Sequence, residues 1–212
     1  MKLCFLFLLI GLYACGQTEK KKYSVNPKAK QLNDSAVQAA MNNENYSGAI
    51  VLLNEAIKLD SNYYRAYSNK LTFQFALKQY NEALPTAKKI NMLRPEDPIG
   101  FVSTGMIYEI LHDTISSKKY FAEADKHFNK ILDTMDRTST SYELLIMNKA
   151  INLILLGQQQ NGNALLSKLY DKSKSNFMKE AVSRLLNKTK GEILDVLLNP
   201  EKQDSSEITD QP

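Results

Sequence analysis

Between about residue 30 and residue 198, apolar residues recur at intervals of three and four with polar residues between them. One clear stretch is formed by Ala49, Ile50, Leu53, Ala56 and Ile57. On a helix of 3.6 residues per turn these positions lie on one side and form an apolar stripe. Such a stripe is stable only when another element covers it. The pattern predicts an all-α protein in which helices pack on one another.

The chain also contains an internal repeat. Residues 45–50 (NYSGAI) align with residues 79–84 (QYNEAL) at an offset of 34 residues, and the same offset places Leu59 on Leu93. A period of this length, read as helix–turn–helix, is the signature of the tetratricopeptide repeat. The chain therefore resembles the tetratricopeptide repeat family. The residues that match the family pattern best are Tyr67, Leu71, Ala83, Ala87 and Pro95, followed by Phe101, Gly105 and Tyr108.

The resemblance implies a right-handed solenoid of antiparallel helix pairs with capping helices at its C-terminal end. A single pair cannot bury its own apolar face, so neighbouring pairs must stack. The expected repeat domain covers residues 31–198. Its expected parts are repeats at about 30–63, 64–97, 98–134 and 140–172, then capping helices at 175–198.

Two details of the repeats need an explanation. In the third repeat the match to the second helix comes seven residues late, at Tyr120 and Ala124, which predicts a longer first helix or turn around residues 112–118. Pro85 falls inside an expected second helix. If Asn81 is the N-cap, Pro85 is the fourth helical residue, where no intrahelical N–H bond is lost.

The N-terminus has the pattern of a lipoprotein signal. Lys2 is followed by an apolar run, residues 3–12, that is about ten residues long and too short to span a bilayer as a helix. The residues that follow, Leu12-Tyr13-Ala14-Cys15, resemble a lipobox. This predicts a signal peptide over residues 1–14 and lipidation of Cys15. The alternative is an ordinary secretory signal with an incidental cysteine.

The polar segments at both ends of the repeats are expected to lie outside the folded domain. Residues 15–30 are read as the lipidated cysteine and a flexible tether. Residues 199–212 have few apolar side chains and are expected to be a disordered tail.

Composition removes several classes of function. The formal net charge of +4 is too small to predict nucleic-acid binding. Cys4 leaves with the signal peptide and Cys15 is acylated, so no disulfide and no thiol nucleophile remain. The two histidines, His112 and His127, lack the i, i+4 spacing of a metal pair. No catalytic motif is present either, so we expect no catalytic residue, no metal site, no cofactor and no enzymatic activity.

In the tetratricopeptide repeat family the first helix of each pair lines a concave groove that binds peptides. Asn69 is the only match to a carboxylate clamp found in some members, and Arg65 could hold a carboxylate with two hydrogen bonds. The alternative is a solvated groove wall with no partner. The groove residues that the resemblance implies are Asp34, Gln38, Met41, Arg65, Asn69, Thr72, Phe75, Val102, Met106 and Glu109.

Together these features predict a membrane-anchored, non-enzymatic protein that binds an envelope protein or peptide in its groove. The alternatives are a stable subunit of an envelope assembly or secretion complex, and an enzyme or small-ligand sensor. Gly16 follows Cys15 where an inner-membrane signal would have Asp, which permits delivery to the outer membrane in some diderms. No acidic run follows Cys15, which favours the periplasmic face of that membrane over the cell surface. In a monoderm the anchor would lie in the outer leaflet of the cell membrane. The sequence leaves open whether residues 173–198 cap the stack or fill its groove, which would block peptide binding.

Overall fold

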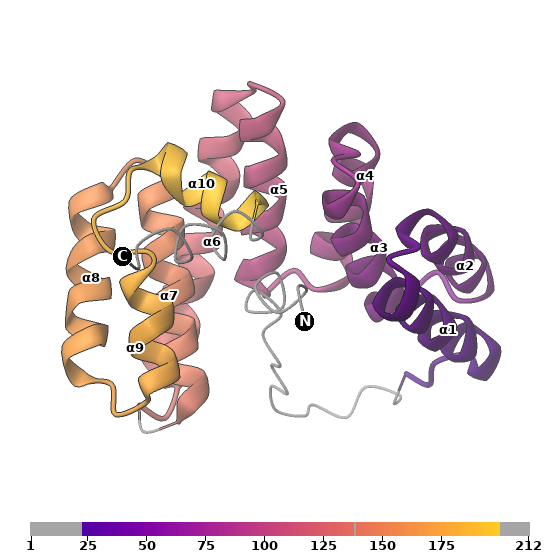
Figure 1. The fold of residues 1–212 in the computed structure, drawn as a ribbon, viewed down its shortest axis with the longest axis horizontal. Helices are drawn as coiled ribbons and strands as arrows, with labels where there is room; N and C mark the ends of the chain where they lie inside the picture. Colours follow the sequence, from indigo (N-terminus) through magenta and orange to yellow (C-terminus); the bar gives the residue numbers. More distant parts are fainter. Residues whose placement is uncertain (1–22, 138, 200–212) are drawn as a thin grey trace, which may run out of the picture. The chain divides into compact units, whose positions relative to one another are not determined.

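The computed structural model describes residues 23–137 and 139–199, and these residues are all-α, as the pattern predicts (Figure 1). They form two compact units, residues 23–96 and residues 97–199. The signal peptide, Cys15, the first part of the expected tether and the tail after Asn199 lie outside the described residues. None of the helices within the described ranges is long and apolar enough to cross a membrane.

Residues 23–96, here called the N-terminal unit, consist of two helix pairs. The connections within each pair are two and three residues long, so the paired helices run antiparallel. The helices are α1 (Pro27–Asn43), α2 (Tyr46–Leu59), α3 (Tyr64–Ala76) and α4 (Tyr80–Leu93).

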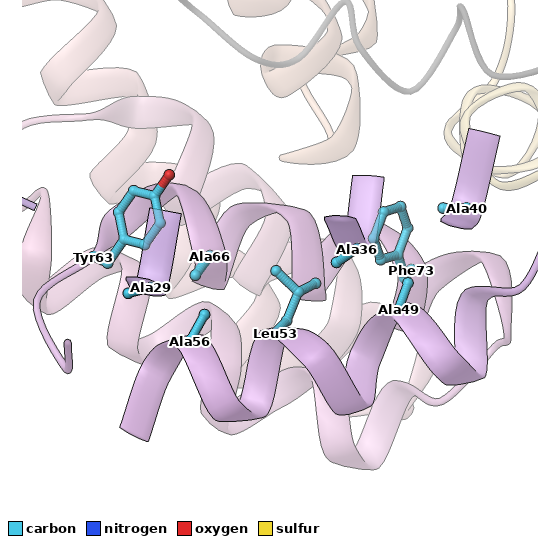
Figure 2. Packing of buried hydrophobic residues seen from close by; sticks show 9 residues of the cluster. All are labelled: Ala29, Ala36, Ala40, Ala49, Leu53, Ala56, Tyr63, Ala66 and Phe73. Atoms are coloured by element: carbon cyan, nitrogen blue, oxygen red, sulfur yellow. The ribbon is translucent and has the colours of Figure 1, made fainter. Parts of the chain in front are cut away.

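Small side chains allow the helices of this unit to approach closely. The core contains alanines from α1, α2 and α3, and Figure 2 shows them around Leu53. Phe73 fills the end of the cluster and lies 5.7 Å from the ring of Tyr46. The core residues are Ala29, Ala36, Ala40, Ala49, Leu53, Ala56, Tyr63, Ala66 and Phe73.

The chain joins this unit earlier than expected, so the prediction of a flexible tether as far as residue 30 is wrong for its last part. Helix α1 begins at Pro27, where proline is well placed, and the Asn26 side chain accepts hydrogen bonds from the N–H groups of Lys28 and Ala29. Asp60, at the end of α2, accepts a hydrogen bond from the Tyr23 hydroxyl and another from the backbone N–H of Asn26. Residues 23–26 therefore belong to the folded unit.

Residues 97–199, here called the C-terminal unit, contain two further helix pairs and two shorter helices. Side chains of Asp97, Asp113, Ser139 and Thr189 accept hydrogen bonds from N–H groups at four of the helix starts. The helices are α5 (Pro98–Ile110), α6 (Thr114–Thr134), α7 (Thr140–Leu155), α8 (Gln159–Lys172), α9 (Asn176–Ser183) and α10 (Lys190–Leu198).

The 34-residue period continues into the C-terminal unit without a shift. Helices α2, α4 and α6 begin at Tyr46, Tyr80 and Thr114, at intervals of 34 residues. Helix α5 ends at Ile110, so the expectation of a longer first helix or turn is wrong. The additional residues instead extend the second helix, α6, which continues to Thr134.

The turns inside the first three pairs each contain a residue with a positive φ angle, which the sequence does not predict. Glu44, Lys78 and His112 have positive φ angles of 51°, 57° and 61° and again lie 34 residues apart. Glycine adopts this left-handed conformation at the lowest cost. Among the described residues, the one glycine with a positive φ is Gly157, at 95° in the turn between α7 and α8. Because these turns lack glycine, they are difficult to recognise from the sequence.

Pro85 also differs from its expected place. The N-cap of α4 is Gln79, and Asn81 lies inside the helix, so the prediction that Asn81 caps it is wrong. Pro85 is then the sixth residue of α4 and lies beyond the first turn. Its missing N–H leaves the carbonyl of Asn81 without its usual helical partner.

Candidate functional site

The first helices of the N-terminal unit, α1 and α3, pack against each other and carry most of the expected groove residues. Asp34, Gln38 and Met41 on α1 and Arg65 on α3 are exposed. Met41 is 67% exposed, which is high for a side chain of its size and polarity. We call these four residues the α1–α3 face.

Charged groups at one end of the α1–α3 face are coupled to one another. Lys30 Nζ lies 2.8 Å from Asp34 Oδ2, with both side chains more than half exposed. The hydrogen bond from Lys30 lowers the pKa of Asp34, while burial acts in the opposite direction and the charge of Arg65 adds to the lowering. The face therefore presents an ionised carboxylate beside two cations at neutral pH.

Asn69, the one match to a carboxylate clamp, has a structural role here. Its side-chain Nδ2 donates to Asn33 Oδ1 at 2.8 Å, and Asn33 Nδ2 in turn donates to Asp34 Oδ1 at 3.2 Å. Asn33 is only 4% exposed, so this bond links α3 to α1 at the edge of the core. One of the two amide N–H groups of Asn69 is thus donated to Asn33.

The two remaining residues of α3 are half-buried. The Thr72 hydroxyl donates to the backbone carbonyl of Ser68 at 3.1 Å. Phe75 packs edge-on against Tyr80, with ring centroids 5.7 Å apart. Both residues border the α1–α3 face and present only part of their surface.

The three groove residues expected on α5 do not line an open groove. Val102 is 1% exposed and Met106 is 2% exposed, because α5 packs against α6 and α7. Glu109 is also engaged, since Oε1 lies 2.8 Å from Lys190 Nζ and Oε2 accepts a hydrogen bond of 2.5 Å from the Ser117 hydroxyl. The expectation that Val102, Met106 and Glu109 are available to a ligand is wrong for the structure as it stands.

Helix α10 explains part of this closure. It packs against α7 (Figure 1). Its first residue, Lys190, forms an ion pair with Glu109 on α5. The Lys190 ammonium also lies 5.8 Å from the centre of the Phe121 ring on α6. Helices α5 and α7 are the first helices of their pairs. Within this unit, α10 therefore packs against first helices, whereas α9 packs against α8 and α7.

Lys190 changes the electrostatics of Glu109. Burial raises the pKa of Glu109, but hydrogen bonds from Lys190 and Ser117 outweigh it and hold the pKa below its ordinary value. The carboxylate is thus ionised and paired. Sequence reasoning missed this pair, although the Thr189-x-x-Glu192 capping box marks the start of α10 and places Lys190 at its first position.

The histidines occupy ordinary structural positions. His127 stacks on Phe101 with ring centroids 5.0 Å apart, and His112 is the exposed turn residue with positive φ. Within residues 23–137 and 139–199, no three His, Cys, Asp or Glu side chains are close enough to hold a metal ion together.

The helix pairs define the class of the protein as a tetratricopeptide-like helical repeat fold. No protein-family model matches the chain. No curated protein matches it either. Among solved structures, the chain is similar to MamA, residue 41 to the end, from Desulfovibrio magneticus RS-1. The two share 14% identity over 76% of this chain and 78% of that chain, with a TM-score of 0.48. A likeness at this level says nothing about function.

Proposed function

We propose that this protein is a lipid-anchored, non-enzymatic scaffold that binds an envelope protein or peptide through the α1–α3 face. One observation carries the proposal. The residues that the repeat pattern assigns to ligand contact on α1 are exposed, and Arg65 of α3 is exposed near Asp34. The carboxylate of Asp34, the cation of Arg65, the amide of Gln38 and the exposed Met41 suit a peptide that offers both charge and apolar surface.

The anchor part of the proposal rests on the lipobox-like residues before Cys15. Residues 16–22 lie between Cys15 and Tyr23, the first described residue. At no more than about 3.6 Å per residue, this connection keeps Tyr23 within about 30 Å of the membrane surface. Such a short connection favours a partner that is itself membrane-bound. We place the anchor at the periplasmic face of the outer membrane, if the cell is a diderm.

Substitution of Cys15 tests the anchor. Cys15→Ser removes the only thiol that can receive a diacylglyceryl group, so the chain should move from the membrane fraction to the soluble fraction. Immunoblotting of fractionated cells, with Cys4→Ser as the matched control, measures the change. The Cys4→Ser chain should remain in the membrane fraction. Quantitative membrane association of the Cys15→Ser protein would contradict a lipid anchor.

Charge reversal on the α1–α3 face tests partner binding. Arg65→Glu should reduce the amount of the main cross-linked partner recovered with the full chain at least tenfold, because it places a second negative charge beside Asp34. Lys58→Glu, the same charge change at an exposed position of α2, should have no effect. Both variants should keep the wild-type helical circular dichroism signal. Equal loss with the two variants, or loss with neither, would contradict binding through this face.

The same experiment separates the main proposal from its alternative, a stable subunit of an assembly or secretion complex. A scaffold that exchanges partners shows saturable recovery, whereas a subunit co-purifies in a fixed ratio without cross-linking. An enzyme or a small-ligand sensor remains the second alternative.

A further inference from the structure

Helix α10 caps the C-terminal unit and is also amphipathic, as a helical peptide ligand would be. Ile193, Val196 and Leu197 are buried beneath it, while Gly191, Glu192 and Asp195 face solvent. Lys190 precedes the first buried residue by three positions. The side of α10 that meets the unit therefore reads cation–x–x–apolar–x–x–apolar–apolar.

The surface that receives Lys190 is well suited to a cation. Glu109 is ionised and held in place by the Ser117 hydroxyl, which approaches to 2.5 Å. The Phe121 ring lies 5.8 Å from the ammonium and adds the attraction of an aromatic face. Glu109 and Ser117 contact each other without any contribution from α10, so this cation site does not need α10 to assemble.

Several features allow α10 to separate from the rest of the unit. It is nine residues long, and an isolated helix of that length is marginal in water. Its capping box, Thr189 with Glu192, is complete within the segment and needs no partner from the rest of the unit. Its burial rests on three apolar side chains, which only partly offset the ordering of its backbone.

We propose that α10 is a built-in occupant of a second binding site, and that this site accepts an amphipathic helix of another protein when α10 leaves it. The incoming helix would carry Lys or Arg three residues before its first apolar anchor, as α10 does. The site lies within the C-terminal unit and is independent of the α1–α3 face. The protein would then hold one exposed surface and one that is closed until a competing helix displaces α10.

A peptide with the sequence of residues 188–199, labelled with a fluorophore, tests the proposal on the full chain. It should bind the wild-type protein weakly, because α10 occupies the site. The double variant Ile193→Asp, Leu197→Asp removes two buried anchors of α10 and should bind the peptide at least tenfold more tightly. Gly191→Asp adds a charge on the exposed side of α10 and should leave peptide binding at the wild-type level.

A second part of the experiment tests whether the peptide needs a cation at the position of Lys190. In the double variant, adding Glu109→Gln should weaken peptide binding at least tenfold, and so should replacing Lys190 by Glu in the peptide. Equal binding to the wild type and the double variant, or binding to neither, overturns the proposal. A dimer by light scattering that the peptide dissociates assigns the site to a second copy of this chain, and also overturns it.

Hydrogen exchange of the wild-type chain keeps the proposal testable if the double variant does not fold. The amides of α10 should exchange at least tenfold faster than those of the middle of α7, because α10 opens without the rest of the unit. Exchange of α10 and α7 at the same rate, in one cooperative step, would show that α10 cannot leave separately and would overturn the proposal.

Discussion

Replacing Phe121 with alanine is expected to destabilise the C-terminal unit by about 3–5 kcal/mol, the range for a buried phenylalanine truncated to alanine. Phe121 is fully buried, and its ring fills the space beside Gly105 on α5. The loss would leave a cavity between α5 and α6 and remove the ring that faces Lys190. Opening free energies of α5–α7 amides, measured by native-state hydrogen exchange, report the change.

An exposed phenylalanine provides the control. Phe177 on α9 is 64% exposed, so Phe177→Ala removes the same atoms from a position where water already covers them. The expected change is within about 0.5 kcal/mol. Similar losses for Phe121→Ala and Phe177→Ala would mean that the packing of α5 on α6 is not what stabilises this unit.

Replacing Gly162 with alanine is expected to lower the free energy of unfolding by about 1–3 kcal/mol, the range for overpacking a well-packed core. We expect the upper end of that range, because the added methyl group would collide with backbone. A Cβ atom at Gly162 would lie 2.7 Å from the backbone oxygen of Ala150 and 2.5 Å from Ile154 Cγ1. The contact with the Ala150 oxygen cannot be relieved by a side-chain rotation, because that atom belongs to the backbone, so α8 must move away from α7. Thermal unfolding followed by circular dichroism, together with hydrogen exchange of α7 and α8, measures the loss.

Gly191 is the matched control for this substitution. It also lies in a helix, but a Cβ atom there meets no described atom within 4 Å. Gly191→Ala should therefore be neutral or stabilise α10 by up to roughly 1 kcal/mol through helix propensity. If Gly162→Ala changed the free energy of unfolding as little as Gly191→Ala, α7 and α8 could not pack as closely as described.

Much of the fold follows from the repeat period. The alanines at 49 and 83 predict where second helices pack, because small residues at a fixed interval mark close helix contacts. The prediction failed at the third pair, where the equivalent position is Ser117. Ser117 is fully buried and its hydroxyl is satisfied by Glu109, which a search for alanine cannot anticipate. The repeat pattern therefore matches seven residues later, at Ala124, instead of at Ser117.

A second reason for that failure is an exchange of volume between helices. At the position of Leu53 and Ala87, the third pair has the large Phe121, and the opposing first helix has Gly105 in place of Leu71. The sequence pattern of one helix alone does not show that the larger side chain on α6 is matched by the smaller residue on α5. The compensation is visible only when both helices are seen in contact.

The candidate site was less predictable than the fold. The positions carried over to α1, and Arg65 on α3, are exposed side chains. The same step failed on α5, because Val102 and Met106 are buried and Glu109 is paired with Lys190 of α10. A partner from a distant part of the chain leaves no trace in the local pattern, so no reading of α5 alone could find it.

The central claim is that the α1–α3 face of the anchored protein contacts a protein partner. The most direct measurement is site-specific photo-cross-linking in cells, with a photoreactive amino acid at Gln38 on α1 and, for comparison, at Val51 on α2. Both positions are exposed in the same unit. We expect a discrete adduct from Gln38 that is absent from Val51 and is lost when Arg65→Glu is added. No adduct from Gln38, or the same adducts from both positions, would contradict it.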